Sequence, residues 1–289
     1  MSYPNGTIVT SAPVELKRAE ANAVARMYNP QVLDDVTVER ITYMSDGLKI
    51  NGYLARPNAP GHYPVLIWNR GGTDDRGALN DLTAYLILAS TAQWGYIVLA
   101  SHYRGNLGSE GVDEWGGNDV NDAASLIATA KLIPGSDPSR MAIEGASRGG
   151  MTTYRVLTMD TAFTCAIVHA GVSDVVSLCC AKDNFARFCD QLLDRFTEEE
   201  RRREVQRRSA LHFADRLPKT TPILMLHGDR DTVIPQQQSD IFAEKLAELG
   251  VPHEYHVIPG GGHVALKDGS YKEIDRYRRA WLERWLAAP

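Results

Sequence analysis

The chain has 289 residues, of which 44% are hydrophobic and 23% are charged, and its formal net charge at pH 7 is -5. This composition is ordinary for a globular protein and excludes a fibre or a disordered chain. The excess of acidic residues provides no field that would attract a polyanion, so we do not expect a nucleic-acid partner. No stretch approaches the roughly 18 apolar residues of a membrane-spanning helix, and residues 1–14 lack the apolar core of a signal peptide. The sequence therefore predicts a soluble, cytoplasmic protein without membrane contacts.

Residues 1–35 are predicted to form an N-terminal extension, with a helix over residues 13–29. The next segment differs, because Val36–Ile41 and Leu48–Leu54 have the composition of strands and flank a Ser-Asp-Gly turn. Two such strands joined by a glycine-containing turn are typical of an antiparallel hairpin. We place this hairpin at the start of a single domain that covers residues 36–289.

Five short apolar runs without alternation follow, separated by segments of helix length; they are residues 65–68, 97–100, 141–143, 166–168 and 223–226. Runs of this kind are typical of strands buried on both faces, as in a parallel sheet. The segments at 236–249 and 271–287 carry apolar residues at helical spacing and are predicted to be helices. Alternating strands and helices predict an α/β fold, with a mostly parallel central sheet, an antiparallel N-terminal hairpin and helices on both faces.

Residues 173–216 form the longest segment between core strands, and we predict that they are a helical insertion. Within it, Thr197 and Glu200 have the spacing of a capping box, which indicates the start of a helix. Arginines follow glutamates at four-residue intervals, as in Glu204 and Arg208, which is the order that stabilises an exposed helix face. The basic run therefore predicts a solvated helix rather than a nucleic-acid patch.

The four cysteines show no C-x-x-C spacing; they are Cys165, Cys179, Cys180 and Cys189. Adjacent cysteines do not easily bridge each other, so we predict reduced, partly buried thiols. No pair of cysteines or histidines has the spacing of a zinc site. We therefore expect neither a metal nor another cofactor.

The sequence Gly145-Ala146-Ser147-Arg148-Gly149 follows the predicted strand at 141–143 and precedes a predicted helix. This is G-x-S-x-G in the strand–turn–helix context that makes the motif informative. The turn is so tight that the positions two before and two after the serine must be small, and it exposes the hydroxyl above the sheet. The alternative is a glycine-rich turn whose serine caps a helix. We predict that Ser147 is a nucleophile.

A serine hydroxyl needs a base that takes its proton, and the base needs a carboxylate that holds it in place. After G-x-S-x-G the expected chain order is acid and then histidine. The chain supplies both after its last two strands, and we predict Asp231 as the acid and His263 as the base. Asp229 is the competing acid, and His227 is predicted to be structural because it precedes the acid. Two further histidines at strand ends are also expected to be structural, His102 and His169.

The tetrahedral intermediate of acyl transfer needs two N–H donors directed at its oxyanion. One donor is predicted to be the backbone N–H of Arg148, the residue after Ser147. The other is expected from Gly71 or Gly72, just past the strand at 65–68, because paired glycines let the backbone approach a ligand closely. The alternative for these two glycines is an ordinary turn.

In order and spacing these motifs resemble the catalytic domain of the prolyl oligopeptidase family, which has the α/β-hydrolase fold. The resemblance covers residues 38–287 and is carried by six stretches: 101–111, 115–122, 145–150, 170–174, 227–235 and 260–263. It implies the same three catalytic residues and places the second oxyanion donor in the Gly71-Gly72 turn, with Gly72 preferred. The chain departs from the family pattern at Arg148, where many members have tyrosine, and at Arg70, where many have histidine.

The resemblance also bears on the substrate. Larger members of the family carry a β-propeller that restricts access to short peptides, whereas about 35 residues precede the hairpin of this sequence. We therefore predict hydrolysis of carboxylic esters through an acyl-enzyme, with hydrolysis of short peptides or aminoacyl amides as the alternative. A non-catalytic binding protein on the same fold is the alternative from a different class. The expected partner is a small-molecule ester or a short peptide, and a homo-oligomer is left open.

Overall fold

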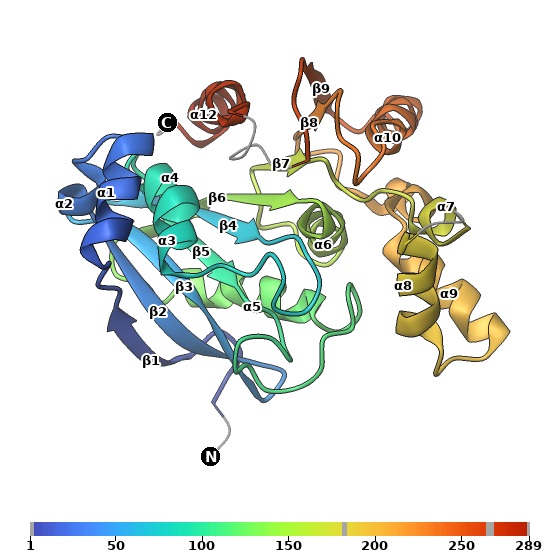
Figure 1. Ribbon diagram of the computed structural model, residues 1–289, viewed down its shortest axis with the longest axis horizontal. Helices are drawn as coiled ribbons and strands as arrows, with labels where there is room; N and C mark the ends of the chain where they lie inside the picture. Colours follow the sequence, from blue (N-terminus) through green and yellow to red (C-terminus); the bar gives the residue numbers. More distant parts are fainter. Residues whose placement is uncertain (1–2, 181–183, 264–268, 288–289) are drawn as a thin grey trace.

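The computed structural model describes residues 3–180, 184–263 and 269–287 and shows one sheet with helices against both of its faces (Figure 1). The strands follow the order β1-β2-β3-β5-β4-β6-β7-β8-β9 across the sheet. Their bounds are Ile8–Pro13 (β1), Val36–Ser45 (β2), Leu48–Pro57 (β3), Tyr63–Asn69 (β4), Ile97–Ser101 (β5), Ser136–Ala146 (β6), Cys165–His169 (β7), Ile223–Gly228 (β8) and His253–Ile258 (β9). Strands β1, β2, β3 and β5 pair antiparallel, and the strands from β5 to β9 pair in parallel. The predicted mostly parallel sheet with an antiparallel hairpin is confirmed.

The hairpin of β2 and β3 turns at Asp46 and Gly47, which both have positive φ. Such a backbone matches the right-handed twist of two paired strands, which explains a turn of only two residues. One edge strand, β1, was not predicted from the sequence. Its residues are half-buried or exposed and show no apolar alternation, so its pairing with β2 is what makes it a strand.

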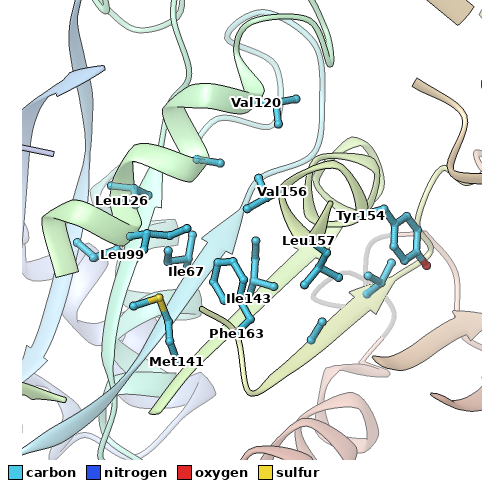
Figure 2. Close-up of a cluster of buried hydrophobic side chains, with 14 of the residues drawn as sticks. Ile67, Leu99, Val120, Leu126, Met141, Ile143, Tyr154, Val156, Leu157 and Phe163 are labelled. Carbon is cyan, nitrogen blue, oxygen red and sulfur yellow. The ribbon is translucent and has the colours of Figure 1, made fainter. Parts of the chain in front are cut away.

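The helices divide between the two faces of the sheet. Helices α5 (Val120–Ala130), α6 (Arg148–Leu157) and α10 (Gln237–Leu249) pack against one face, in the core that Figure 2 shows. The other face carries α1 (Arg18–Met27), α2 (Val32–Asp35), α3 (Asp81–Ala84), the π-helical turn η1 (Tyr85–Ala89), α4 (Ser90–Ala92) and α12 (Tyr271–Leu286). Leu66 belongs to this second core and Ile67 to the first, because successive strand residues point to opposite faces. Burial on both faces explains the continuous apolar runs of these strands.

The two C-terminal helices are confirmed as α10 and α12, and Gly250 ends α10 in the left-handed conformation. The leading helix predicted over residues 13–29 is shorter. Pro13 still pairs in β1, and the Glu20 carboxylate accepts the Lys17 N–H at the start of α1. Within the described ranges, no helix combines the length and the apolar character needed to cross a bilayer.

The segment between β7 and β8 is helical and lies at one end of the molecule, beside α6 and α10 (Figure 1). It consists of α7 (Val175–Cys180), α8 (Asn184–Leu193), α9 (Glu198–Arg208) and two short 3-10 turns, η2 (Ala210–His212) and η3 (Ala214–Arg216). At the start of α9 the predicted capping box is present. The Thr197 hydroxyl accepts the Glu200 N–H, and the Glu200 carboxylate accepts the Thr197 N–H.

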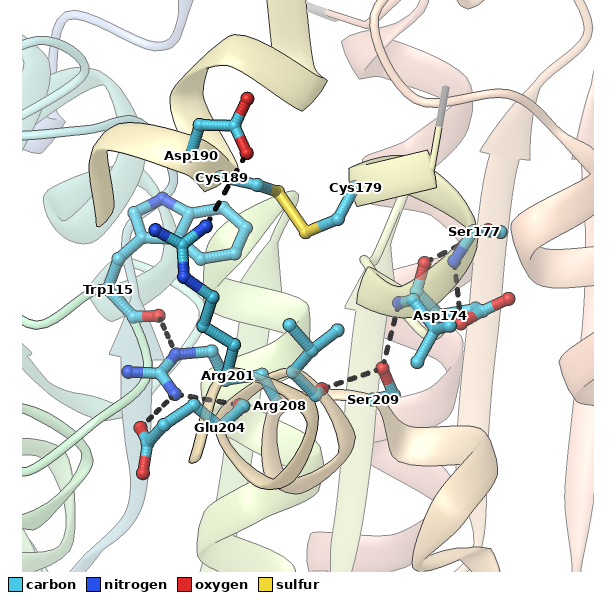
Figure 3. The surroundings of a disulfide bond; sticks show 12 residues. Trp115, Asp174, Ser177, Cys179, Cys189, Asp190, Arg201, Glu204, Arg208 and Ser209 are labelled. Atoms are coloured by element: carbon cyan, nitrogen blue, oxygen red, sulfur yellow. Dashed lines mark hydrogen bonds and ion pairs between the residues drawn. A yellow bond between two sulfur atoms is a disulfide. The ribbon is translucent and has the colours of Figure 1, made fainter. Parts of the chain in front are cut away.

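The prediction that Arg208 lies on an exposed face of α9 is wrong, although its predicted ion pair with Glu204 is present (Figure 3). The Arg208 side chain is buried, and its Nε donates to the Trp115 carbonyl oxygen at 3.0 Å. Helical spacing identifies partners on the same helix, but it cannot show that another loop covers the end of that helix.

Cys179 at the end of α7 and Cys189 in α8 form a disulfide, with Cα atoms 5.5 Å apart (Figure 3). The prediction of reduced thiols is therefore wrong for this pair, whereas Cys165 is a buried free thiol and Cys180 an exposed one. A separation of ten residues matches no cysteine motif. The bridge depends on how α7 packs against α8, which spacing alone does not reveal.

Candidate active site

Ser147 lies at the turn between β6 and α6, at the carboxyl edge of the sheet. Its backbone has φ 56° and ψ -121°, a strained conformation for a residue with a side chain. Three hydrogen bonds fix it. Its N–H donates to the His169 carbonyl at 2.9 Å, and its own carbonyl accepts the N–H groups of Gly150 and Val172 at 2.9 and 3.2 Å. A strained serine held from a neighbouring strand and from the following helix is the geometry of a nucleophile elbow.

The glycines of the motif are required by close backbone approaches. A Cβ on Gly145 would lie 2.0 Å from the Gly149 carbonyl oxygen, and a Cβ on Gly149 would lie 2.0 Å from the Asn69 carbonyl oxygen. No side chain fits at such distances, so β6, α6 and β4 meet this closely only with glycine at both positions. The two glycines of G-x-S-x-G are thus required sterically by the turn that exposes Ser147.

Asp231 and His263 follow two neighbouring parallel strands, β8 and β9, which bring them to the same edge of the sheet. His263 Nδ1 lies 2.7 Å from Asp231 Oδ2. The Asp231 side chain is completely buried, and the His263 side chain is 16% exposed. In the described ranges, Asp229 forms no hydrogen bond or ion pair with His263. Its Oδ1 accepts the Gly260 N–H at 2.7 Å and so holds the loop that leads to His263.

Asp231 is surrounded by donors. Its Oδ1 accepts the backbone N–H groups of Val233 and Ile234 at 2.8 and 2.9 Å. Its Oδ2 contacts His263 and lies 3.4 Å from His227 Nε2. Burial alone would raise the pKa of Asp231, but hydrogen bonds from the two histidines and from the backbone hold it well below its ordinary value. A carboxylate only accepts, so His263 carries its proton on Nδ1 and keeps Nε2 as its basic nitrogen.

His227 is buried and uses both ring nitrogens inside the protein. Its Nε2 lies 3.0 Å from the Ile234 carbonyl oxygen, which can only accept, so Nε2 carries the proton. Nδ1 then accepts from the Ser239 hydroxyl at 2.7 Å. His227 is therefore placed to orient Asp231 and not to act as a base.

The groups predicted for the oxyanion lie beside Ser147. Arg148 begins α6, and an N–H in the first turn of a helix has no acceptor within that helix. Gly71 lies against the serine, because a Cβ on Gly71 would be 3.1 Å from Ser147 Cβ and 3.7 Å from Ser147 Oγ. Gly72 has a φ of 81°, and a Cβ there would lie 1.9 Å from the Arg76 carbonyl oxygen. Only glycine permits this turn to pass within contact distance of Ser147.

Buried arginines fill the two positions at which the chain departs from the family pattern. The Arg148 side chain is 1% exposed and forms ion pairs with Asp113 and Asp119, so it fixes the loop before α5. Arg70 is also buried, and its Nε and Nη2 donate to the His102 carbonyl at 3.1 and 3.0 Å. Sequence reasoning missed the two aspartates, and the available signal was that a buried arginine needs carboxylates close by.

Ser147 and His263 line one cavity of about 860 Å³. Part of its wall is aromatic, because Trp115 packs edge-on against Phe185 and Phe188 of α8, with ring centroids 5.5 and 5.1 Å apart. Among the residues that the structure describes, no hydrogen bond joins Ser147 directly to His263. Such bonds are often long in unliganded enzymes and tighten when substrate binds.

Comparisons with known proteins agree with this geometry. A family model described as the prolyl oligopeptidase family matches residues 83–289. The chain is 29% identical over 226 residues to the uncharacterized peptidase YtmA of Bacillus subtilis, covering 78% of this chain and 85% of that protein. It resembles the solved structure of a Mycobacterium tuberculosis puromycin-hydrolyzing peptidase with a TM-score of 0.72 and 26% identity, over 86% of this chain and 40% of that one. A Pyrococcus horikoshii acylaminoacyl peptidase gives a TM-score of 0.75 at 21% identity, over 96% of this chain and 45% of that one.

The sheet, the elbow and the cavity define the class of the protein as an α/β-hydrolase. The family model matches most of the chain, so the chain belongs to the prolyl oligopeptidase family. The predicted resemblance is confirmed, and so is the predicted class, a serine hydrolase enzyme. At 21% identity the acylaminoacyl peptidase supports the fold alone. This chain spans less than half of either solved chain.

Proposed function

We propose that this chain is a serine peptidase that cleaves short peptides or aminoacyl amides. The observation that carries the proposal is the hydrogen bond of His263 to the buried Asp231 at 2.7 Å, with His263 lining the same cavity as the strained Ser147. Family membership and the similarity to proteins named as peptidases favour an amide bond over an ester bond as the target.

In the proposed reaction, Ser147 Oγ forms a bond to the carbonyl carbon while its proton passes to His263 Nε2. The backbone N–H groups of Arg148 and Gly72, or of Gly71 in place of Gly72, stabilise the oxyanion. The C–N bond then breaks, and the proton on Nε2 moves to the departing amine. A water molecule, deprotonated by the same nitrogen, then forms a bond to the acyl carbon. The bond from that carbon to Ser147 Oγ breaks, Oγ takes the proton back from Nε2, and the carboxylic acid leaves. Asp231 stays ionised and keeps the histidine in the required tautomer.

Ester hydrolysis, the first prediction from the sequence, uses the same groups and is the second candidate. That prediction assumes an open cleft, whose few contacts would position an amide poorly, whereas an ester needs less positioning. The aromatic wall formed by Trp115, Phe185 and Phe188 instead offers contacts on the cavity side that the insertion covers. These contacts weaken the assumption of an open cleft, on which the prediction of ester hydrolysis depends.

Matched substrates distinguish the two candidates. One acyl group is presented as a p-nitrophenyl ester and as a p-nitroanilide, and kcat/KM is measured for both with wild type and Ser147→Ala. For a peptidase we expect kcat/KM for the ester to exceed kcat/KM for the anilide by less than about 100-fold, which corresponds to about 2.7 kcal/mol in the barrier. A larger ratio supports the esterase. If a fluorophosphonate fails to label Ser147 and neither substrate is cleaved, the chain is the non-catalytic binding protein.

The cytoplasmic location predicted from the sequence stays a prediction. The disulfide between Cys179 and Cys189 argues against it, because disulfides are rare where glutathione and thioredoxin keep thiols reduced. Alkylation of free thiols before cell lysis, followed by fractionation and mass spectrometry, tests the point. Recovery of the bridged protein in a periplasmic or extracellular fraction would reject the cytoplasm.

A further inference from the structure

The cavity extends beyond Ser147 into a space between the sheet and α12, which we name the rear compartment. Its apolar lining comes from the core under α12 and η1 and not from the insertion; it consists of Trp68, Leu86, Ile87, Leu226, Ile258 and Ile274. Its polar lining includes Glu144, His169, Asp275 and Arg278, together with the hydroxyl-bearing side chains of Tyr28, Ser90 and Tyr271. The reaction proposed above uses none of these side chains.

The register of the sheet places His169 beside the nucleophile and on the lining of the rear compartment. His169 pairs with Ala146, the residue before Ser147, and with Leu226 on the face that α12 covers. Its carbonyl accepts the Ser147 N–H, and its side chain is 14% exposed and lines the cavity. The imidazole is thus fixed next to the nucleophile and opens toward the rear compartment.

Glu144 sets the tautomer of His169. Its Oε1 lies 2.7 Å from His169 Nε2, and Arg278 donates to its two carboxylate oxygens at 2.7 and 2.8 Å. Burial would raise the pKa of Glu144, but Arg278 and His169 lower it to about 2, so this carboxyl is ionised. An ionised carboxylate only accepts, so Nε2 carries the ring proton and Nδ1 of the neutral imidazole is an acceptor. In the described part of the chain, no group donates to this Nδ1.

Helix α12 and η1 complete the compartment. Tyr271, Ile274, Asp275 and Arg278 occupy positions i, i+3, i+4 and i+7 of α12 and form one stripe that lines the cavity. Among the described residues of this lining, the carboxylates of Asp275 and Glu144 and the guanidinium of Arg278 sum to one net negative charge when the imidazole is neutral. On the η1 side the wall is a π-helical turn, a feature that frequently marks functional sites.

Proton transfer indicates which part of the substrate lies there. In the proposed reaction His263 delivers its proton to the departing amine, so this amine must leave on the His263 side of the site. His263 and the α12 residues Tyr271 and Ile274 line the same cavity. The rear compartment is therefore next to the leaving group, and the aromatic wall beneath the insertion remains for the acyl group.

We propose that the rear compartment binds the leaving-group part of the substrate and that His169 is a specificity-determining residue within it. This inference rests on the peptidase function proposed above. The compartment fits an amine leaving group with an apolar side chain and with an N–H beyond the scissile bond that donates to His169 Nδ1. An amino-acid amide has these properties. A free carboxylate would meet the net negative charge, and an alkyl ester at the same position lacks the N–H donor.

The test keeps the best acyl group constant and attaches it to leucinamide, to leucine methyl ester and to leucine, with the released amine quantified by chromatography. Wild type should prefer the leucinamide substrate over the other two by about tenfold in kcat/KM, the size of effect that one hydrogen bond supports. His169→Phe keeps a flat ring without an acceptor and should reduce the preference over the methyl ester to about twofold or less. His169→Gln retains an N–H that can donate to Glu144 and an oxygen that can accept, so it should restore part of the preference for the leucinamide substrate over the methyl ester.

Two further variants make the result decisive. His256→Phe is the matched control, because the His256 ring stacks on Tyr277 outside the cavity lining, and it should keep the wild-type preference. Ile274→Trp fills the compartment from α12 with His169 in place. A fourth substrate carries the same acyl group on glycinamide. Ile274→Trp should lower kcat/KM for the leucinamide substrate about tenfold more than for this glycinamide substrate, and this comparison decides alone if His169→Phe does not fold.

The proposal is overturned if His169→Phe keeps the leucinamide preference or if Ile274→Trp shows no dependence on the size of the leaving residue. Failure of the peptidase function is a different result. In that case a fluorophosphonate does not label Ser147 of the wild type, and none of the three leaving groups is released.

Discussion

Replacement of Asp231 by asparagine tests the proposed triad sharply, because the surroundings dictate how the new amide is oriented. Oδ1 accepts two backbone N–H groups, from Val233 and Ile234, and must remain an oxygen. The amide nitrogen is therefore expected at the Oδ2 position, 2.7 Å from His263 Nδ1. There it donates to Nδ1, so the ring proton moves to Nε2, the atom that should accept the proton of Ser147.

The size of the loss follows from these contacts. A similar change in a well-studied triad lowers turnover by about ten-thousand-fold, which corresponds to about 5.5 kcal/mol in the barrier. The flipped amide would keep the active tautomer, but it would point an N–H₂ at the two backbone donors and lose both of their hydrogen bonds. That costs about 3 kcal/mol or more, so fewer than about one molecule in 100 adopts it. We therefore expect kcat/KM to fall by between about 100-fold and ten-thousand-fold.

Asp229→Asn is the matched control, because its carbonyl oxygen can still accept the Gly260 N–H and Asp229 is not the carboxylate that bonds to His263. Its kcat/KM on the same anilide should stay within about tenfold of wild type. Circular dichroism and urea unfolding would establish that both variants are folded. A reversed order of the two effects refutes the assignment of the acid, and an Asp231→Asn enzyme within tenfold of wild type refutes the triad.

The remaining predictions concern the nucleophile and three buried contacts. Ser147→Ala should lose several orders of magnitude in turnover and remain folded, and a folded, active variant would sink the proposed mechanism. Arg148→Met leaves two buried carboxylates unpaired and should lower the free energy of unfolding in urea by about 3–5 kcal/mol. Glu144 has a pKa lowered from 4.5 to about 2. Its ionised form therefore adds about 3 kcal/mol to the free energy of unfolding above pH 4.5, and this contribution is lost as the pH falls toward 2. The stability gap between wild type and Glu144→Gln should close over that range, and a constant gap contradicts the linkage. Replacing Cys179 and Cys189 by serine removes a disulfide between positions ten residues apart and should lower the free energy of unfolding of the insertion by about 3 kcal/mol. Limited proteolysis should then cut the insertion faster than in wild type.

The sequence by itself determined the features that depend on short-range geometry. Buried parallel strands appear as apolar runs because both of their faces are covered, and the elbow around Ser147 appears as two glycines because a Cβ at either would lie 2.0 Å from a backbone oxygen. The order of Asp231 and His263 after the last two strands follows from the same topology. Each of these signals is short, since Asp231 and His263 each lie within about five residues of the end of a strand.

Only the tertiary structure decided which distant groups meet. The strand β1, the burial of Arg208 and the bridge from Cys179 to Cys189 all depend on contacts between elements, and sequence spacing carries no record of them. The rear compartment is the clearest case, since β4, β6, β7, η1 and α12 each supply part of its lining. A lone histidine at the end of β7 looks structural in sequence. It becomes a candidate for substrate selection only when the fold places Glu144 on one of its nitrogens and a cavity before the other, because a side chain's chemistry is set by what packs around it.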